Sequence, residues 1–287
     1  MILSIFTPAY NRSYSLPILY ESLKRQTCME FEWIIVDDGS TDNTEILIHP
    51  WLQEQIFCIR YIKQKNGGKH RAINRGLKEA KGELFFIVDS DDYLTDDAVE
   101  KIIVAYDAIR GDDSFCGVCP LKVDKELRKI GGEFPYEILD CSCLDFRYKY
   151  WIKGDMSEVV RTEVFRKFPF PEIPGERFCP EALVWNRIGM YYKFRYTNDK
   201  VYVCEYLPDG LTAKITKIRM QSPVASCICY KEQTSMPVPF NIKMKSAINY
   251  WRFWFCASSN KKPSISPFWW WTMPIGLLLH FKDNRIK

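Results

Sequence analysis

Residues 83–94, with the sequence ELFFIVDSDDYL, join an unbroken apolar run to a cluster of acids. The run from Leu84 to Val88 is typical of a strand that is buried on both faces, as in a parallel sheet. Asp89, Asp91 and Asp92 follow at its carboxyl end. In open α/β sheets ligands bind at that end of the strands, and carboxylates there suit a divalent cation that holds phosphate oxygens. The stretch therefore predicts an α/β fold with a site for a metal-bound diphosphate.

Strand and helix patterns alternate through the first hundred or so residues, which predicts a βαβαβαβ order and a largely parallel sheet. The expected strands are 2–6, 31–36, 57–62 and 83–88. The expected helices are 15–26, 41–52, 68–81 and 95–109, with Pro50 straining the second and Thr95 capping the last.

Polar segments follow three of these strands: TPAYNR at 7–12, DDGSTDNT at 37–44 and DSDD at 89–92. Alone, an acidic pair after a strand is more often a solvated turn than a metal site. The carboxyl ends of parallel strands meet at one edge of a sheet, so three polar ends together predict a single site there.

In order, the motifs TPAYNR, VDDGSTDNT, KNGGKHRAINRGLKEAKGE and FIVDSDDYL resemble those of family 2 glycosyltransferases with the GT-A fold, of the type that builds bacterial surface polysaccharides. The resemblance covers residues 1–110 closely and 150–190 more loosely. It implies a Rossmann-like, mostly parallel mixed sheet flanked by helices.

The same resemblance implies roles for individual residues. The nucleoside of a nucleotide sugar would be bound by Thr7, Pro8, Tyr10, Arg12 and Asp38, and the diphosphate with its Mn²⁺ or Mg²⁺ by Asp89 and Asp91, with Asp91 nearest the metal. Many members place an Arg before the Asn of the third motif, where this chain has Ile73 and Asn74. Lys69, His70 or Arg71 would then supply the positive charge, with an ordinary solvated helix start as the alternative for Lys69 and Arg71.

Sugar transfer also requires a carboxylate that removes the proton from the acceptor hydroxyl. The candidate base is Glu181, with Glu176 as second choice, although members often have paired acids where Ala182 follows Glu181 here. Asp155 would contact the donor sugar or the acceptor, with a loop-capping role as the alternative. Glu181 opens an expected helix over 181–190, after a proline-rich loop that we expect to border the site.

The C-terminal segment is basic and aromatic. From residue 240 to the end it holds five of the nine tryptophans and eight cationic residues against one acid, Asp283; the cations are Lys243, Lys245, Arg252, Lys261, Lys262, Lys282, Arg285 and Lys287. This charge of +7 leaves about −3 of the total of +4 for the rest of the chain. Such a composition fits an anionic membrane surface. Residues 263–281 carry no formal charge but contain prolines, so an in-plane helix or hairpin is favoured over a span.

A helical stripe precedes that stretch and predicts core packing; it comprises Met244, Ala247, Ile248, Trp251, Trp254 and Phe255. We expect three parts: 1–110 as the nucleotide-sugar half of the GT-A domain, 111–225 as its acceptor half, and 226–287 as a helical membrane-associating tail.

The eleven cysteines and the N-terminus bear on the compartment. An odd number of cysteines and the absence of a signal-peptide pattern in MILSIFTPAY favour reduced thiols in the cytoplasm. Cys116 and Cys119 form a C-x-x-C and Cys141 and Cys143 a C-x-C, but a second C-x-x-C is missing, so we predict no zinc.

These features together predict an inverting, metal-assisted glycosyltransferase that moves a sugar from a nucleotide sugar, a UDP-sugar being favoured, to a polysaccharide or lipid-linked glycan. Inversion is implied by the resemblance. We expect peripheral or monotopic attachment to the inner face of the cell membrane and no nucleic-acid partner, and a homodimer is left open. The alternative is a noncatalytic nucleotide-binding subunit of a polysaccharide synthesis complex. A nicotinamide dehydrogenase is disfavoured because no G-x-G-x-x-G follows the first strand of this chain. A nucleotidyltransferase is disfavoured because TPAYNR is not the glycine-rich phosphate loop that such enzymes usually have.

Overall fold

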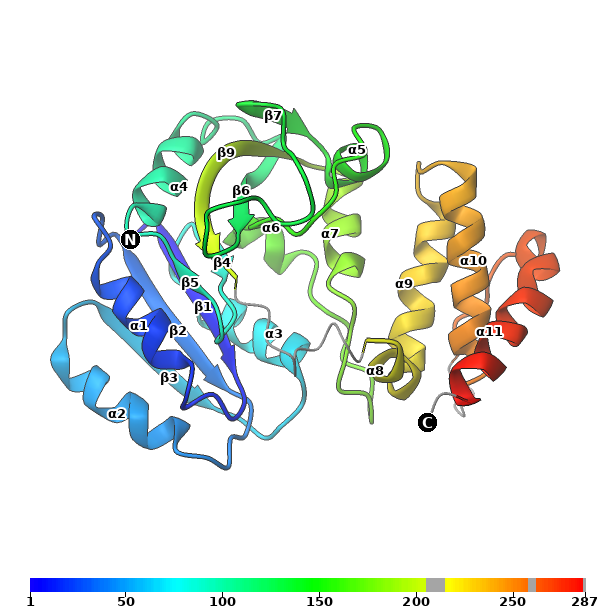
Figure 1. Cartoon of the computed structure of the whole chain (residues 1–287), viewed down its shortest axis with the longest axis horizontal. Coiled ribbons are helices and arrows are strands. Elements are labelled where there is room, and N and C mark those ends of the chain that lie inside the picture. Colours follow the sequence, from blue (N-terminus) through cyan, green and yellow to red (C-terminus); the bar gives the residue numbers. More distant parts are fainter. Residues whose placement is uncertain (205–214, 258–261, 286–287) are drawn as a thin grey trace. The chain divides into compact units, whose positions relative to one another are not determined.

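The structure, a computed structural model, describes residues 1–204, 215–257 and 262–285 (Figure 1). Lys261 and Lys287, which contribute to the basic tail, lie outside these residues. The chain forms two compact units, one of Met1–Pro169 with Tyr191–Tyr206 and one of Phe170–Met190 with Leu207–Lys287. These units are defined by packing and not by function. The assignment of residues 1–110 to donor binding, 111–225 to acceptor binding and 226–287 to membrane association therefore stays a prediction.

The first unit is built on a mixed sheet that contains nine strands among the described residues. The strands are β1 (Leu3–Ala9), β2 (Phe31–Asp37), β3 (Cys58–Lys63), β4 (Leu84–Ile87), β5 (Tyr93–Leu94), β6 (Phe115–Val123), β7 (Ile138–Cys141), β8 (Val159–Arg161) and β9 (Lys193–Val203). Their order is β3-β2-β1-β4-β8-β6-β9-β5, with β7 also paired to β9. The first four strands in this order are parallel, which confirms the expected α/β fold.

The helices of this unit connect and flank the strands (Figure 1). They are α1 (Leu16–Lys24), α2 (Thr44–Glu54), α3 (Lys69–Glu79), α4 (Ala98–Asp107), α5 (Cys143–Tyr148) and α6 (Thr162–Arg166). The four helices expected in the first 110 residues are all present, and α2 continues through Pro50. The prediction that Thr95 caps α4 is wrong. Asp97 is the N-cap residue, and the Thr95 hydroxyl donates to Asp97 Oδ1 in the turn before the helix.

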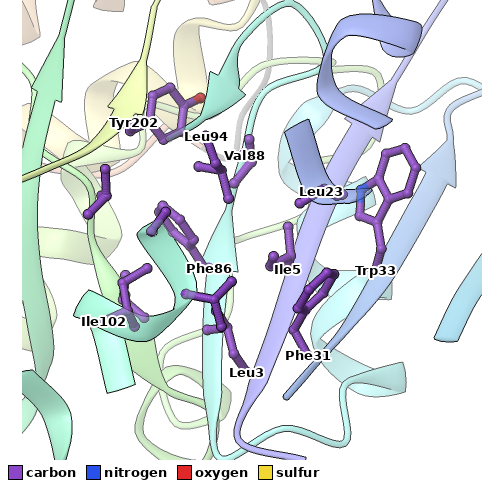
Figure 2. Close-up of a cluster of buried hydrophobic side chains, with 14 of the residues drawn as sticks. Leu3, Ile5, Leu23, Phe31, Trp33, Phe86, Val88, Leu94, Ile102 and Tyr202 are labelled. Carbon is purple, nitrogen blue, oxygen red and sulfur yellow. The ribbon is translucent and has the colours of Figure 1, made fainter. Parts of the chain in front are cut away.

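The core lies between the sheet and its helices (Figure 2). Ile5, Trp33 and Phe86 come from three neighbouring parallel strands, and Leu23 and Ile102 come from helices α1 and α4. All are almost completely buried. Burial of so many large apolar side chains holds the strand ends in fixed positions relative to one another.

The second unit is helical among its described residues. Its helices are α7 (Ala182–Gly189), α8 (Ile215–Gln221), α9 (Pro223–Ser235), α10 (Phe240–Trp254), the 3-10 helix η2 (Pro267–Thr272) and α11 (Met273–Arg285). Helix α10 packs between α9 and α11 (Figure 1). Ala247 and Trp251 are buried in its core and Met244, Trp254 and Phe255 pack against them, which confirms five residues of the predicted stripe; the sixth, Ile248, is half-buried. Among the described helices, none has the length and hydropathy needed to cross a membrane.

The cysteine pair of the C-x-x-C lies on β6. Cys116 and Cys119 are both fully buried. Burial raises the pKa of both thiols well above the ordinary value, which disfavours the thiolate that zinc requires. The prediction of no zinc therefore has a physical basis, and a zinc assay would test it.

Candidate functional site

A cluster of acids and cations occupies the carboxyl end of β4. The Lys69 ammonium lies 2.6 Å from Asp89 Oδ1, and the Arg12 guanidinium lies 3.9 Å from Asp91 Oδ2. The carboxylate side chains remain 29% and 22% exposed, so a ligand can reach them. The structure thus brings together residues from the first, third and fourth sequence motifs.

The loop before α3 depends on Asp38, which is buried. Its Oδ1 accepts hydrogen bonds from the Gln64 side chain and the Gly67 amide, both at 2.8 Å, and its Oδ2 accepts one from the Gly68 amide at 2.7 Å. Gly68 has a φ of 96°, a conformation that favours glycine, and α3 starts at the next residue. Asp38 therefore shapes the turn that directs Lys69 toward Asp89. Oδ2 accepts only the Gly68 bond among the residues described and has a second lone pair, so a contact of Asp38 with a nucleoside stays a prediction.

Tyr202 on β9 holds the acidic segment from the other side. Its hydroxyl accepts a hydrogen bond from the Asp89 amide at 2.9 Å and donates one to Asp92 Oδ2 at 2.7 Å. The Lys122 ammonium of β6 lies 4.2 Å from the centre of the Tyr202 ring. The sequence analysis missed both residues. The only signal for Lys122 was a cation within the apolar strand FCGVCPLKV, and Tyr202 had none.

The cations and the burial act on the carboxyl groups in different ways. Burial disfavours the charge of Asp89, but Lys69 and Lys122 outweigh it and hold the pKa of Asp89 below its ordinary value. Burial and the Asp89 charge raise the pKa of Asp91, and they raise that of Asp92 to about 7. Asp89 is thus the carboxylate whose negative charge the site stabilises most clearly.

The end of β1 and the loop after it are held by hydrogen bonds to β2 and α2. The Thr7 hydroxyl is buried and accepts a hydrogen bond from Trp33 Nε1 at 2.9 Å, so Thr7 belongs to the core. Pro8 ends up half-buried on β1, whereas Tyr10 is 49% exposed just after it. The Arg12 amide donates to Thr44 Oγ1 at 3.1 Å, which ties the loop to the start of α2.

His70 and Arg71 follow Lys69 in the first turn of α3. The Arg71 guanidinium donates to the Gly67 carbonyl at 2.8 Å and so braces the start of α3. His70 is buried. Lys69 is the candidate whose ion pair with Asp89 is described above, and the roles of His70 and Arg71 stay predictions.

The predicted acceptor-side residues lie in both units. Glu176 is buried in the second unit and accepts hydrogen bonds from the Val224 and Ala225 amides at 2.7 and 2.9 Å, which caps the start of α9. Glu181 is half-buried at the N-cap of α7, one residue before the helix that was expected to begin with it. Asp155 is exposed in a loop of the first unit.

Asp89 and Asp91 are chemically suited to a divalent cation. Mg²⁺ is usually bound through one or two carboxylates together with substrate phosphates. The described residues contain no group of three or more His, Cys, Asp or Glu arranged to hold an ion by themselves. Two partly exposed carboxylates next to cations fit a metal that is also bound by diphosphate oxygens better than a metal bound by protein ligands alone.

The motifs that build this site are those of a known family. The model of glycosyl transferase family 2 matches residues 4–159, from β1 to the start of β8. This chain belongs to that family. Solved structures show the same fold. S. aureus TarS 1-349 in complex with UDP has a TM-score of 0.63 at 20% identity, covering 91% of this chain and 74% of that one. The Pyrobaculum calidifontis mannosyltransferase PcManGT, solved with GDP-Man and Mn²⁺, has a TM-score of 0.58 at 15% identity, covering 99% and 75%.

Sequence similarity to curated proteins is confined to part of the chain. Glycosyltransferase GlyG of Streptococcus pneumoniae serotype 4 is 36% identical over 102 residues, which is 35% of this chain and 34% of that protein. The poly(ribitol-phosphate) β-N-acetylglucosaminyltransferase TarS of Staphylococcus aureus is 31% identical over 114 residues, or 39% and 20% of the two chains. The matched part thus amounts to about a third or less of each of these relatives.

Proposed function

We propose that this family 2 member is an inverting glycosyltransferase that moves a sugar from a nucleotide sugar to a hydroxyl of a growing polysaccharide or lipid-linked glycan. The observation that carries the proposal is the pairing of Asp89 with Lys69 and of Asp91 with Arg12 at the carboxyl edge of the parallel strands. A UDP-sugar is the favoured donor, because TarS, which shares the fold, was solved with UDP and with UDP-GlcNAc.

The cluster suits the charge that sugar transfer creates. When the bond to the sugar breaks, negative charge develops on the departing diphosphate, and fixed cations that face it lower the barrier. Lys69, Arg12 and Lys122 provide such cations. Asp89 and Asp91 would hold Mn²⁺ or Mg²⁺, which supplies Lewis-acid neutralisation of the phosphate oxygens when bound.

Glu181 is our candidate for the general base, and Glu176 is second. A base must reach the acceptor hydroxyl, and Glu181 is half-buried, whereas both Glu176 oxygens already bind backbone amides. Asp155, exposed in its loop, is our candidate for contact with the sugar or the acceptor. Thr7, Pro8, Tyr10 and Asp38 are proposed to line or support the nucleoside pocket.

A lipid-linked acceptor would be presented at a membrane. We place the protein at the inner face of the cell membrane, attached peripherally or monotopically through the basic, aromatic segment after residue 240. This placement is supported by the charge of that segment, where Asp283 is the one acid.

Calorimetric titration of UDP with and without Mn²⁺ tests the donor site. Binding should require Mn²⁺ and fall at least tenfold in Asp91→Asn. Asp96→Asn is the matched control, because Asp96 lies five residues later and pairs with Arg25 outside the cluster. UDP binding that is unchanged by metal and by Asp91→Asn would contradict the proposed donor site. No UDP binding at all, with GDP bound instead, would replace UDP by another nucleotide.

A further inference from the structure

Helix α11 packs on α10 through a side that carries a glycine and an acid. Gly276, His280 and Asp283 recur at the spacing of one helical face. A Cβ at Gly276 would lie 2.4 Å from Trp251 Cβ, so the two helices are in close contact there. Asp283 forms a two-point ion pair with Arg252, whose second nitrogen lies 2.8 Å from Oδ1. The side of α11 that meets α10 therefore includes a glycine and a paired acid, and Leu277 and Leu279 are half-buried.

The preceding turn is anchored in the same unit. Trp269 is only 5% exposed, and its carbonyl accepts hydrogen bonds from Trp251 Nε1 at 3.2 Å and from Thr272 Oγ1 at 2.6 Å. These bonds fix the 3-10 helix η2 against α10. The neighbouring tryptophans are consequently held on the outside of the unit.

The outward surface is apolar. We call it the aromatic face; it comprises Phe268, Trp270, Trp271, Ile275, Leu278 and Phe281, which are 62%, 60%, 51%, 43%, 70% and 55% exposed. Helices of globular proteins normally turn their apolar side inward. Six large apolar side chains left exposed together, on elements fixed by an ion pair and a glycine contact, indicate that the aromatic face meets another apolar phase.

The charges around the aromatic face indicate which phase this is. Lys282 is exposed and lies four residues after Leu278, on the same side of α11. Lys262 rests on the Trp254 ring at 4.0 Å. Asp283, the single acid after residue 240, is already neutralised by Arg252. Tryptophans rimmed by lysines favour the boundary between anionic headgroups and acyl chains. Two copies of so basic a surface would repel each other.

We propose that the aromatic face inserts into the headgroup boundary of an anionic bilayer, with α11 lying in the membrane plane. A helix of 13 residues is about 20 Å long, too short to cross a hydrocarbon core of about 30 Å. The inference rests on the membrane attachment proposed above and is independent of sugar transfer. It specifies six side chains that enter the lipid.

Vesicle co-sedimentation of the full chain tests this surface. The vesicles are equal parts phosphatidylglycerol and phosphatidylcholine, or phosphatidylcholine alone. We expect binding to the anionic vesicles, with a blue shift of tryptophan emission. The triple variant Trp270→Ser, Trp271→Ser, Leu278→Ser should lose at least tenfold in partitioning, and Lys282→Glu should weaken binding to the anionic vesicles only.

The matched control replaces three exposed apolar residues of the first unit: Trp151→Ser, Tyr191→Ser and Ile46→Ser, which are 56%, 74% and 70% exposed. It should pellet like the unaltered protein. Equal pelleting of the aromatic-face triple variant, or no vesicle binding by the unaltered protein, would overturn the inference. So would a dimer in light scattering that the triple variant abolishes, because a second copy would then cover the face. UDP titration of each variant keeps this result separate from the donor site.

Discussion

Replacing Tyr202 by Phe tests whether β9 positions the acidic segment. The substitution removes the hydroxyl that accepts from the Asp89 amide and donates to Asp92, and leaves the buried ring in place. A hydrogen bond to a carboxylate contributes about 1.5–3 kcal/mol, and an amide left without an acceptor costs about 1–3 kcal/mol. Because the neighbouring Asp89 side chain is 29% exposed, water replaces some of this loss, and we expect about 2 kcal/mol of local destabilisation.

Hydrogen exchange measures this effect at the site itself. A loss of 2 kcal/mol should make the Asp89 amide exchange about 30-fold faster, because each 1.4 kcal/mol is a factor of ten. A peptide covering residues 84–94 would report it by mass spectrometry. UDP affinity in Mn²⁺ should fall in parallel, because the carboxylates are no longer held in place.

Tyr196→Phe is the matched control. Tyr196 lies on the same strand, is 2% exposed and stacks on Phe146, and no hydrogen bond of its hydroxyl occurs among the residues described. In the Tyr196→Phe variant, the exchange rate of the Asp89 amide and the UDP affinity should match those of the unaltered protein. If the Asp89 amide of the Tyr202→Phe variant exchanges at the original rate and the variant binds UDP equally well, the positioning role of Tyr202 is refuted.

Three further predictions concern the cation, the base and the helix contact. Lys69→Met should raise the pKa of Asp89 and weaken UDP binding about tenfold by calorimetry, whereas Lys65→Met, at an exposed cation four residues earlier, should not. Glu181→Gln should retain UDP binding and lose roughly 10²–10⁴-fold in sugar-transfer rate. Glu176→Gln should instead lower the melting temperature, because α9 loses its charged cap. The reverse pattern would exchange the roles of the two residues. Gly276→Ala should destabilise the second unit by about 1–3 kcal/mol in denaturant, against little change for Gly111→Ala, where a Cβ meets nothing within 4 Å; equal midpoints would argue against the close contact of α10 and α11.

The first half of the fold could be predicted because its signals are local. Apolar runs define the buried strands, amphipathic spacing defines the helices between them, and the alternation of the two allows little besides a parallel sheet. The position of Asp89 and Asp91 followed from the same pattern, since residues after parallel strands share one edge. The cap of α4 was missed, because Thr95 and Asp97 are both good capping residues and the choice depends on the turn before the helix.

The rest of the site depends on contacts between distant residues. The contact of Asp38 with a nucleoside stays a prediction, and its hydrogen bonds to the Gly67 and Gly68 amides were found only in the structure. Tyr202 reaches Asp89 from 113 residues away, a contact that no local pattern encodes. Lys122 joins the same group only because β6 and β9 pair in the sheet.

In the C-terminal helices, too, some features could be predicted from the sequence and others depended on tertiary contacts. Composition and spacing were enough to predict a basic, aromatic, helical segment whose stripe packs as core. Which side of α11 faces outward was settled by Gly276 and by the ion pair of Arg252 with Asp283, 31 residues apart. Hydrophobicity alone does not decide this, because apolar residues lie all round the helix, with Leu277 and Leu279 half-buried and Ile275 and Leu278 exposed. Periodicity specifies what a segment forms, whereas close packing and paired charges between segments specify which of its faces remains free.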